Sequence, residues 1–488
     1  MGRVLTNTIT LEVAAESALG IQPTAGWKTI EPNSIGKFGP MLKKIAREPI
    51  SKNRQRRKGA LVDLDSSVEF ECDITYDHMR MFVEGLFFAT AKGGVNFTPT
   101  AVTATGYTVA SGGAIADGTL FYARGFSDPA NNGLKIAAGV STGTEVKAAG
   151  LVAEVTPPLG AIIEICGVQG AVGDLDIDAS GNLVSTALNW TTTDVQVGQF
   201  IFIGGLSTTS ALNFTNTVNR GLARVLSVAA GLLTLDKKST TFVVEADATQ
   251  TVQVFWGQYI RNVAVDSADY LERTYHFELG YENLAGSGVD KYEYAEGNFA
   301  NEIVFDLPVT SKGTMKCNFI GTDCLDPTLT RATGAATPIP AVGTVPINTS
   351  GDFVRLRVTD VDELGLTTDF KSLTLTIKNN VSPEKVLGTL GGKYMNAGLF
   401  DVEIDGQILF TDSGVLEAMR ANETLTMEVC IRNEDGGFIF DVPSMCIEGG
   451  DKDFPVNQTV GIQMKALAFQ DARFGSSISL STFPYMPL

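Results

Sequence analysis

One pattern occurs twice in this chain, and that repetition constrains the fold more than any other feature. Residues 66–89 and 402–425 each contain an alternating strand, a short polar turn and a short amphipathic helix. Strand pairs of matching character follow at 273–323 and 425–471, each with a Gly-rich turn and a Glu-Gly dipeptide. A duplicated unit is typical of rings and filaments in which one chain supplies two quasi-equivalent subunits. The repetition therefore points to architecture rather than catalysis.

Composition places the chain among turn-rich β proteins. Its 488 residues are enough for about three domains. It has 51 Gly against 18 Pro, and Thr and Val are abundant, which favours a mainly β fold of strands and tight turns. Apolar runs stay well short of the roughly 20 residues that a membrane helix needs. The N-terminal sequence lacks a signal-peptide pattern, so we expect synthesis in the cytoplasm and no membrane partner.

The sequence offers little that could perform catalysis or bind a metal. Six Cys are scattered without a CxxC pair, so we expect buried thiols. His78 and His276 are the two histidines, and no GxSxG pattern accompanies them. The Asp-rich stretch 174–182 resembles a calcium loop, but it has Ala179 and Ser185 where the sixth-position Gly and twelfth-position Glu belong. We therefore predict that the protein is not an enzyme and holds no cofactor or metal.

The net charge is strongly negative, −18 at pH 7. A general DNA-binding protein would instead carry a basic face. An acidic surface repels phosphates, so DNA could pass along it without binding. Plain solubility explains the same charge, and composition alone favours that simpler interpretation.

The pattern along the chain predicts one unit interrupted by an insertion and followed by a second unit. The first unit comprises 1–91 and 259–325, and a linker at 326–350 leads to the second unit at 351–488. Residues 92–258 are poor in charge and rich in Gly, Ala, Thr and Val, and they contain two similar halves. We expect small β-barrels or sandwiches there. Because insertions are tolerated at exposed loop tips, we also expect this block to project outward and to be dispensable.

A basic stretch at 37–58 stands out in an otherwise acidic chain. It holds nine Lys or Arg residues against the single Glu48, and Pro40 and Pro49 make one continuous helix improbable. The stretch is typical of a long extended loop, which in compact domains is usually functional. Contact with an acidic protein surface is favoured over contact with nucleic acid, since the rest of the chain supplies such surfaces.

Several segments resemble the tail tube protein family of long-tailed phages. They include YEYAEGNFANEIVFDLP (292–308), SLTLTIKNNVSPEKVLGTLGGKYMNAGLFDVEIDGQILFTD (372–412) and VNQTVGIQMKALAFQD (456–471). Within them the resemblance is strongest at Asn379-Asn380, at the Gly388–Gly392 cluster and at Ala397-Gly398. It covers 1–90 and 260–488, whereas 92–258 depart from the minimal family pattern and resemble decoration modules.

The resemblance implies a structural subunit of a phage tail tube. Such proteins have two packed antiparallel sheets flanked by a helix, and neighbouring subunits join their sheets into an inner barrel. With two units per chain, three chains would form a pseudo-sixfold ring, and stacked rings would form a hollow conduit for genome ejection. The implied location is the virion tail, and the implied partners are further copies, the tape measure protein, the tail terminator and tip proteins, and passing DNA without specific binding.

An alternative function remains open, namely a tail-tip or baseplate protein, or a carbohydrate-binding surface protein that uses the inserted modules. Exposed aromatic residues would be the cue for sugar binding, and Trp190 and Trp256 are the tryptophans of the insertion.

Within the tube interpretation, two groups of charged residues are candidate functional sites. The basic stretch is predicted to contact the next ring through Lys43, Lys44, Arg47, Arg54, Arg56, Arg57 and Lys58. The acidic residues Glu69, Glu71, Glu403 and Asp405 alternate with Val68, Phe70, Val402 and Ile404, so they share the face of their strands that points away from the core. That face is either the lumen wall or the outer surface.

Overall fold

The computed structural model describes residues 4–50, 52, 54–139, 141–246, 249–282, 288–359, 365–366, 369–409, 414–457 and 459–487. It is 48% strand and 8% helix, which confirms the predicted mainly β class. The two α-helices among these residues are α1 (Tyr76–Phe87) and α2 (Gly414–Ala421).

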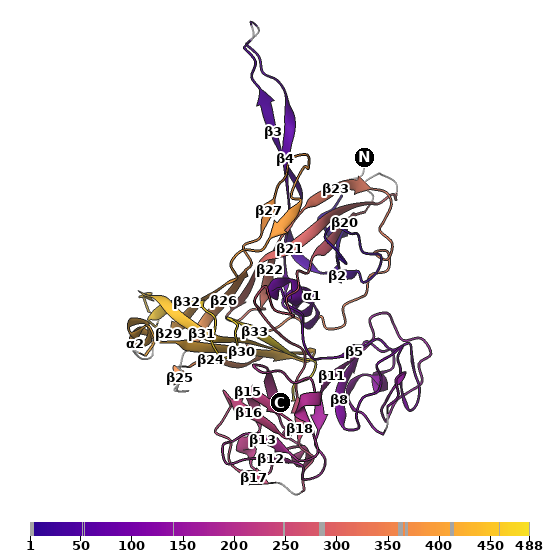
Figure 1. The fold of residues 1–488 in the computed structure, drawn as a ribbon, viewed down its shortest axis with the longest axis vertical. Coiled ribbons are helices and arrows are strands. Elements are labelled where there is room, and N and C mark those ends of the chain that lie inside the picture. The colour runs from indigo at the N-terminus through magenta and orange to yellow at the C-terminus, as the bar shows by residue number, and fades with distance from the viewer. Residues whose placement is uncertain are drawn as a thin grey trace.

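The chain forms two strand sets and one inserted block (Figure 1). The first strand set comprises β1 (Ile9–Ala15), β2 (Lys28–Ile30), β3 (Pro32–Arg47), β4 (Arg57–Asp73), α1, β20 (Tyr275–Tyr281), β21 (Lys291–Pro308), β22 (Thr314–Gly321) and β23 (Asp323–Thr328). The second strand set comprises β24 (Phe353–Thr359), β25 (Gly365–Leu366), β26 (Phe370–Lys378), β29 (Asp401–Leu409), α2, β30 (Leu425–Asn433), β31 (Gly436–Asp453), β32 (Gly461–Ala468) and β33 (Ser479–Phe483). A short hairpin of β27 (Ser382–Glu384) and β28 (Tyr394–Asn396) lies between β26 and β29.

Both strand sets pair their strands in the same order. One sheet of the first set runs β3–β4–β22–β21, and its counterpart in the second set runs β26–β29–β32–β31. The other sheet of the first set runs β2–β1–β20–β21–β23, and its counterpart runs β25–β24–β30–β31–β33. We call β3–β4–β22–β21 and β26–β29–β32–β31 the inner sheets, and the other two the outer sheets. The long strands β21 and β31 belong to both sheets of their sets, and each is bulged where it passes from one sheet to the other.

The core lies between the inner and outer sheets and is continuous across both strand sets. Helix α1 lies within 66–89, where a short amphipathic helix was predicted, and the Thr75 hydroxyl accepts a hydrogen bond from the His78 backbone at its N-cap. Its buried apolar stripe consists of Met79, Phe82, Val83, Leu86 and Phe87. Phe82 packs edge-on against Phe319 of the inner sheet and Tyr275 of the outer sheet, so the helix is fixed to both.

The inserted block lies beside the second strand set, at the bottom of Figure 1. Its strands are β5 (Asn96–Phe97), β6 (Ala101–Val102), β7 (Gly106–Thr108), β8 (Thr119–Arg124), β9 (Gly133–Ile136), β10 (Glu145–Lys147), β11 (Ile162–Gln169), β12 (Leu175–Ile177), β13 (Leu183–Ser185), β14 (Phe200–Ile203), β15 (Gly221–Ala229), β16 (Leu232–Asp236), β17 (Glu245–Ala246) and β18 (Gln253–Phe255). Two hydrophobic clusters fill it, one between Phe97 and Ile163 and one between Val168 and Trp256. The chain then returns through β19 (Tyr259–Arg261), and an isolated bridge joins Lys92 to Tyr259, so the block leaves and re-enters the first set at one place.

Three segments are more ordered than the sequence predicts. The stretch 37–58 is not an extended loop, because most of it lies in β3 and β4, which pair as one long hairpin projecting from the body (Figure 1). Pro40 is compatible with β3 because an edge strand tolerates a missing N–H. Residues 9–15 and 28–30 form β1 and β2, two strands that the pattern did not predict, and 326–328 belong to β23 rather than to a linker.

Candidate functional site

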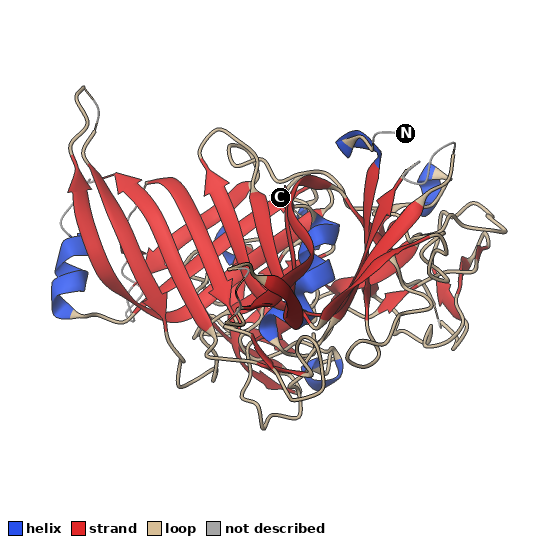
Figure 2. Cartoon of the chain, turned by 90° about the horizontal axis from the view of Figure 1, so that it is seen from above, coloured by secondary structure: helices blue, strands red, loops and turns tan. Residues whose placement is uncertain are grey.

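The two strand sets meet along one pair of strands, which we call the internal seam. β21 pairs antiparallel with β26, from Glu302 opposite Lys378 to Pro308 opposite Ser372. On the core side, Phe305 opposes Leu375 and Leu307 opposes Leu373, and all four side chains are buried. On the other side, the Thr374 hydroxyl donates to the Asp306 carboxylate over 3.0 Å. The seam therefore unites the two inner sheets into one sheet of eight strands, many of which are visible side by side in Figure 2.

This continuous sheet ends on two strands that each have one partner in it among the described residues. β3 pairs with β4, and the C-terminal half of β31 pairs with β32. These two end strands are the counterparts of the strands that meet at the internal seam, since β3 occupies in the first set the place of β26 in the second, and β31 occupies the place of β21. A strand edge with unpaired N–H and C=O groups is a template for pairing with another chain. The two edges are therefore candidate assembly surfaces.

The predicted basic contact residues lie on the outer part of the β3–β4 hairpin. All of them are exposed: Lys43, Lys44, Arg47, Arg54, Arg56, Arg57 and Lys58. Arg56 has Glu48 at 3.1 Å, an exposed pair of the kind that contributes little to stability. Exposed apolar side chains accompany them, including Met41, Ile45 and Ile50. The combination of basic and apolar groups is typical of a protein contact surface.

The four predicted wall residues all lie on the non-core face of the continuous sheet. Glu69 and Glu71 on β4, and Glu403 and Asp405 on β29, are partly exposed, whereas the alternating Val68, Phe70, Val402 and Ile404 are buried. Three of these four acidic residues are paired with lysines of adjoining strands: Lys37 lies 2.5 Å from Glu69, Lys316 3.9 Å from Glu71 and Lys378 2.8 Å from Glu403. Asp405 lies opposite Lys465 in the strand register. This face therefore carries lysines beside the carboxylates and is not uniformly acidic.

The inserted block covers the outer sheet of the second strand set. Six buried apolar residues of the block pack against four of the second set in one cluster: Leu120, Cys166, Phe200, Phe202, Leu222 and Phe255 with Cys430, Ile439, Phe483 and Met486. The block was predicted to project outward as a separate part, and its packing on the second set adds a contact that this prediction did not include. A local sequence pattern could not reveal a contact between residues at least 175 positions apart, the separation of Phe255 and Cys430.

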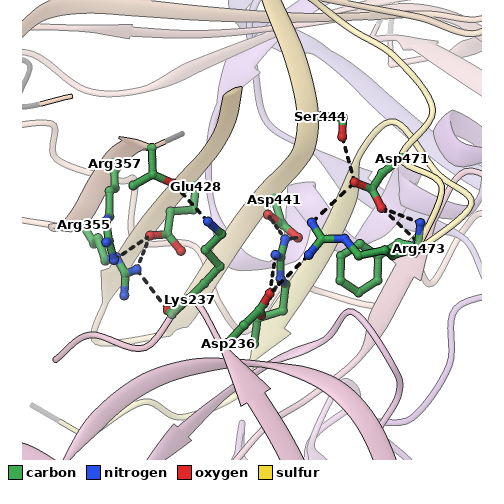
Figure 3. A network of polar contacts seen from close by, with 12 residues as sticks. Asp236, Lys237, Arg355, Arg357, Glu428, Asp441, Ser444, Asp471 and Arg473 are labelled. Atoms are coloured by element: carbon green, nitrogen blue, oxygen red, sulfur yellow. Dashed lines mark hydrogen bonds and ion pairs between the residues drawn. The ribbon is translucent and has the colours of Figure 1, made fainter. Parts of the chain in front are cut away.

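Buried ion pairs reinforce this contact (Figure 3). The Arg224 guanidinium on β15 is fully buried and lies 3.0 Å from Asp441 on β31 and 2.8 Å from Asp236 on β16. Burial raises the pKa of Asp441, and Arg224 counteracts this by stabilising the charged form. Nearby on β30, burial raises the pKa of Glu428 to about 7 although Arg355 opposes that rise. β30 is buried on both faces from Leu425 to Ile431, but Thr426 and Glu428 still alternate with apolar residues there, so its sequence carried no signal of this cover.

The outer sheet of the first strand set is covered differently. Trp27 and the linker residues Ala332 and Ala335 pack against Ala14 and Tyr294. Glu278 on β20 is buried, with Arg331 at 2.6 Å and the Tyr294 hydroxyl donating to it over 2.6 Å. His276 is buried beside Glu16, their nearest atoms 3.1 Å apart. The linker therefore takes the covering role that the inserted block takes on the second set.

The groups considered for chemistry have structural partners. Asp174 accepts hydrogen bonds from the backbones of Thr186 and Ala187, and no cluster of potential metal ligands occurs among the described residues. His78 and five of the six Cys are buried, and Cys446 is half-buried. Trp190 and Trp256 are buried against each other, so neither presents the exposed ring that sugar binding would use.

A cavity of about 510 Å³ lies between α1, the inserted block and residues 339–342. Its carboxylates are held in ion pairs or hydrogen bonds: Glu164 with Arg80 and Arg124, Glu84 with Arg273, and Asp77 with the Val342 backbone. None of the described helices is long and apolar enough to cross a membrane.

Comparison with known proteins identifies one family. The family model described as phage tail tube protein matches residues 6–464, which is nearly the whole chain. The search of curated proteins found no match to this chain.

Proposed function

The chain belongs to the phage tail tube protein family, and from that premise we propose that it polymerises as stacked rings into the hollow conduit through which the genome is ejected. Its role is structural and its place is the virion tail. In this proposal three chains form each ring, the rings stack helically, and DNA passes without specific binding. The tape measure protein and the terminator and tip proteins are the further partners.

The internal seam is the observation that carries this proposal. Two strand sets of the same pairing order are already joined edge to edge within one chain. The two edges that have no partner within the inner sheet, on β3 and β31, are the counterparts of the edges on β26 and β21 that meet at the internal seam. Repeating the seam between chains closes a barrel, and closure removes the exposed edges that otherwise lead to aggregation. Three chains then supply six strand sets to each ring.

Electron microscopy of the purified protein in negative stain tests the proposal directly. We expect long hollow tubes or rings of threefold symmetry. Discrete particles without a channel would instead favour the tail-tip or baseplate alternative.

The basic hairpin is proposed to contact the next ring. Each exposed charge pair contributes only about 0–1 kcal/mol, but the pairs repeat around every ring. Changing Arg54, Arg56 and Arg57 to Glu is expected to stop tube elongation while circular dichroism stays unchanged. Lys147→Glu on the inserted block is the control, which should leave tube length unaltered. High salt should shorten wild-type tubes.

The non-core face of the continuous sheet is proposed to line the lumen. Its paired charges make it polar without a strong field, which suits passage of DNA. Replacing Glu69, Glu71, Glu403 and Asp405 with Lys should allow rings to form but slow DNA ejection, because the wall would then bind phosphates. Ejection at the wild-type rate would place this face on the exterior.

A further inference from the structure

We infer that neighbouring chains of the ring join β31 to β3 in one fixed register, with Asp453 opposite Lys37 and Phe454 opposite Ile35. This inference rests on the proposed ring and specifies the contact that closes it. Its occupant is a second copy of this chain, and its template is the internal seam.

The two strand sets correspond residue by residue through their inner sheets. Bulges fall at equivalent places, between Ala300 and Glu302 on β21 and between Ile447 and Gly449 on β31. Aligned on these bulges and on the pairing with β22 and β32, Asp306 corresponds to Asp453. Aligned on the pairing with β4 and β29, Thr374 corresponds to Lys37. Since Asp306 lies opposite Thr374 at the internal seam, Asp453 should lie opposite Lys37 of the next chain.

The polar side of the seam supports this register. At the internal seam, a carboxylate at this position already accepts a side-chain hydrogen bond across the seam, from Thr374 to Asp306. At the edge, Asp453 supplies the carboxylate again, and Lys37 supplies a cation in place of the hydroxyl. Asp453 and Lys37 are both exposed in the single chain, and Lys37 already contacts Glu69. The proposed contact would place Lys37 between two carboxylates, which an ammonium group can bridge with its three donors.

On the apolar side, the same alignment is compatible with this register at the position of Leu307. Leu307 is 5% exposed at the internal seam, whereas its counterpart Phe454 is 70% exposed. Opposite Phe454, the proposed pairing brings Ile35, with Phe38 close by on the same strand. Both are half-buried and already packed against the main core. The exposed Phe454 ring would therefore extend the core across the boundary between chains, as Leu307 does within one chain.

The edges also carry features that oppose pairing at other registers. β3 has an extra bulge between Ile35 and Lys37 that β26 lacks, and Pro40 removes one N–H donor. Bulges, prolines and charges on an edge strand hinder unspecific pairing. A one-residue slip would turn Phe454 to the polar face, so the register is strongly defined.

Cysteine crosslinking tests the register. In Asp453→Cys combined with Lys37→Cys, directly opposed Cβ atoms lie about 4.5–5.5 Å apart, near disulfide reach. We expect oxidised rings to run as covalent trimers on a denaturing gel. The matched control pairs Asp453→Cys with Met41→Cys, which lies about 13 Å further along β3 and should not crosslink. Each single variant controls for the native thiols.

Charge reversal gives a second readout that does not depend on disulfide geometry. Lys37→Asp or Asp453→Lys alone should lower the fraction of rings in sedimentation roughly tenfold, the equivalent of about 1.4 kcal/mol. The double exchange should restore most of that fraction, and circular dichroism should show each variant folded.

The outcomes separate this inference from the proposed function. If wild-type protein forms tubes but Asp453→Cys crosslinks with Met41→Cys instead of Lys37→Cys, or with neither, the register is wrong and the tube function stands. If the double charge exchange fails to restore rings, the Asp453–Lys37 contact is also wrong. Absence of rings and tubes from wild-type protein contradicts the proposed function itself.

Discussion

The two strand sets share their pairing order and the bulges on β21 and β31, yet their outer sheets are covered by unrelated parts of the chain. Over the first set, Trp27 and the linker form the cover, and Arg331 pairs with the buried Glu278. Over the second set, the inserted block forms the cover, and Arg224 pairs with the buried Asp441.

This difference shows that neither strand set buries its outer sheet by itself. Each set exposes an outer face that something must cover, and the second set depends on a block that is inserted into the first. The block contacts both halves of the chain, since Glu164 pairs with Arg80 on α1 and Arg224 pairs with Asp441 on β31.

Removing the block should have the largest effect. Replacing residues 95–258 with a Gly/Ser linker uncovers Cys430, Ile439, Phe483 and Met486 and leaves Asp441 without its arginine. At about 1.5–3 kcal/mol for each buried apolar side chain, the loss is comparable to the whole stability of a domain, about 5–15 kcal/mol. We expect insoluble protein or no cooperative transition in calorimetry. A soluble variant that still forms tubes would show that the block is dispensable after all.

Removing only the buried arginine should cost less. Arg224→Ala leaves Asp441 and Asp236 without that partner in a buried site, which typically costs about 3–5 kcal/mol. Denaturant unfolding measures this cost. Changing Arg224 to Met and Asp441 to Leu together should recover much of it, because no charge of that pair is then left uncompensated. A single variant as stable as wild type would mean that water reaches the pair.

The internal seam and the proposed contact between chains can be compared through one residue of each, Leu307 and Phe454. Leu307→Ala opens a cavity in the core of the single chain and should lower the free energy of unfolding by about 2–5 kcal/mol. Phe454→Ala changes an exposed side chain and should alter it by less than about 0.5 kcal/mol. Phe454→Ala should nevertheless weaken ring formation in sedimentation. Equal effects on the isolated chain would show that the two positions are not counterparts.

An effect smaller than that of Leu307→Ala is expected in the pH dependence of stability. Burial raises the pKa of Glu428 to about 7, from 4.5, so the folded protein binds this proton more tightly than the unfolded chain does. The contribution of Glu428 to stability is therefore largest below about pH 4.5 and is lost as the pH rises through about 7. Glu428→Gln should remove that decline, on the order of 2 kcal/mol between pH 5 and pH 8. Parallel pH profiles of wild type and variant in thermal unfolding would contradict this account.

Local periodicity carried most of what the sequence could predict. Helix α1 and the alternation of Glu69 with Phe70 depend on neighbours in the sequence, and both were predicted correctly. The β3–β4 hairpin was missed because Pro40 and the glycines hide its alternation. The Arg224–Asp441 pair was missed because its partners are 217 residues apart and meet only when the block packs on β31. The assembly edges, in turn, become visible only when the pairing of every strand is known.

The bulged strands β21 and β31 have a mechanical consequence. Each runs without interruption from the outer sheet into the inner sheet, so one backbone is shared by both layers. When a tube bends, two separate layers could slide past each other by exchanging side-chain contacts. Here such sliding would have to stretch covalent bonds or break the hydrogen bonds on both sides of the bulge. The tube wall should therefore resist sliding of the inner sheet against the outer sheet. A strain at its inner surface should be transmitted directly to its outer surface.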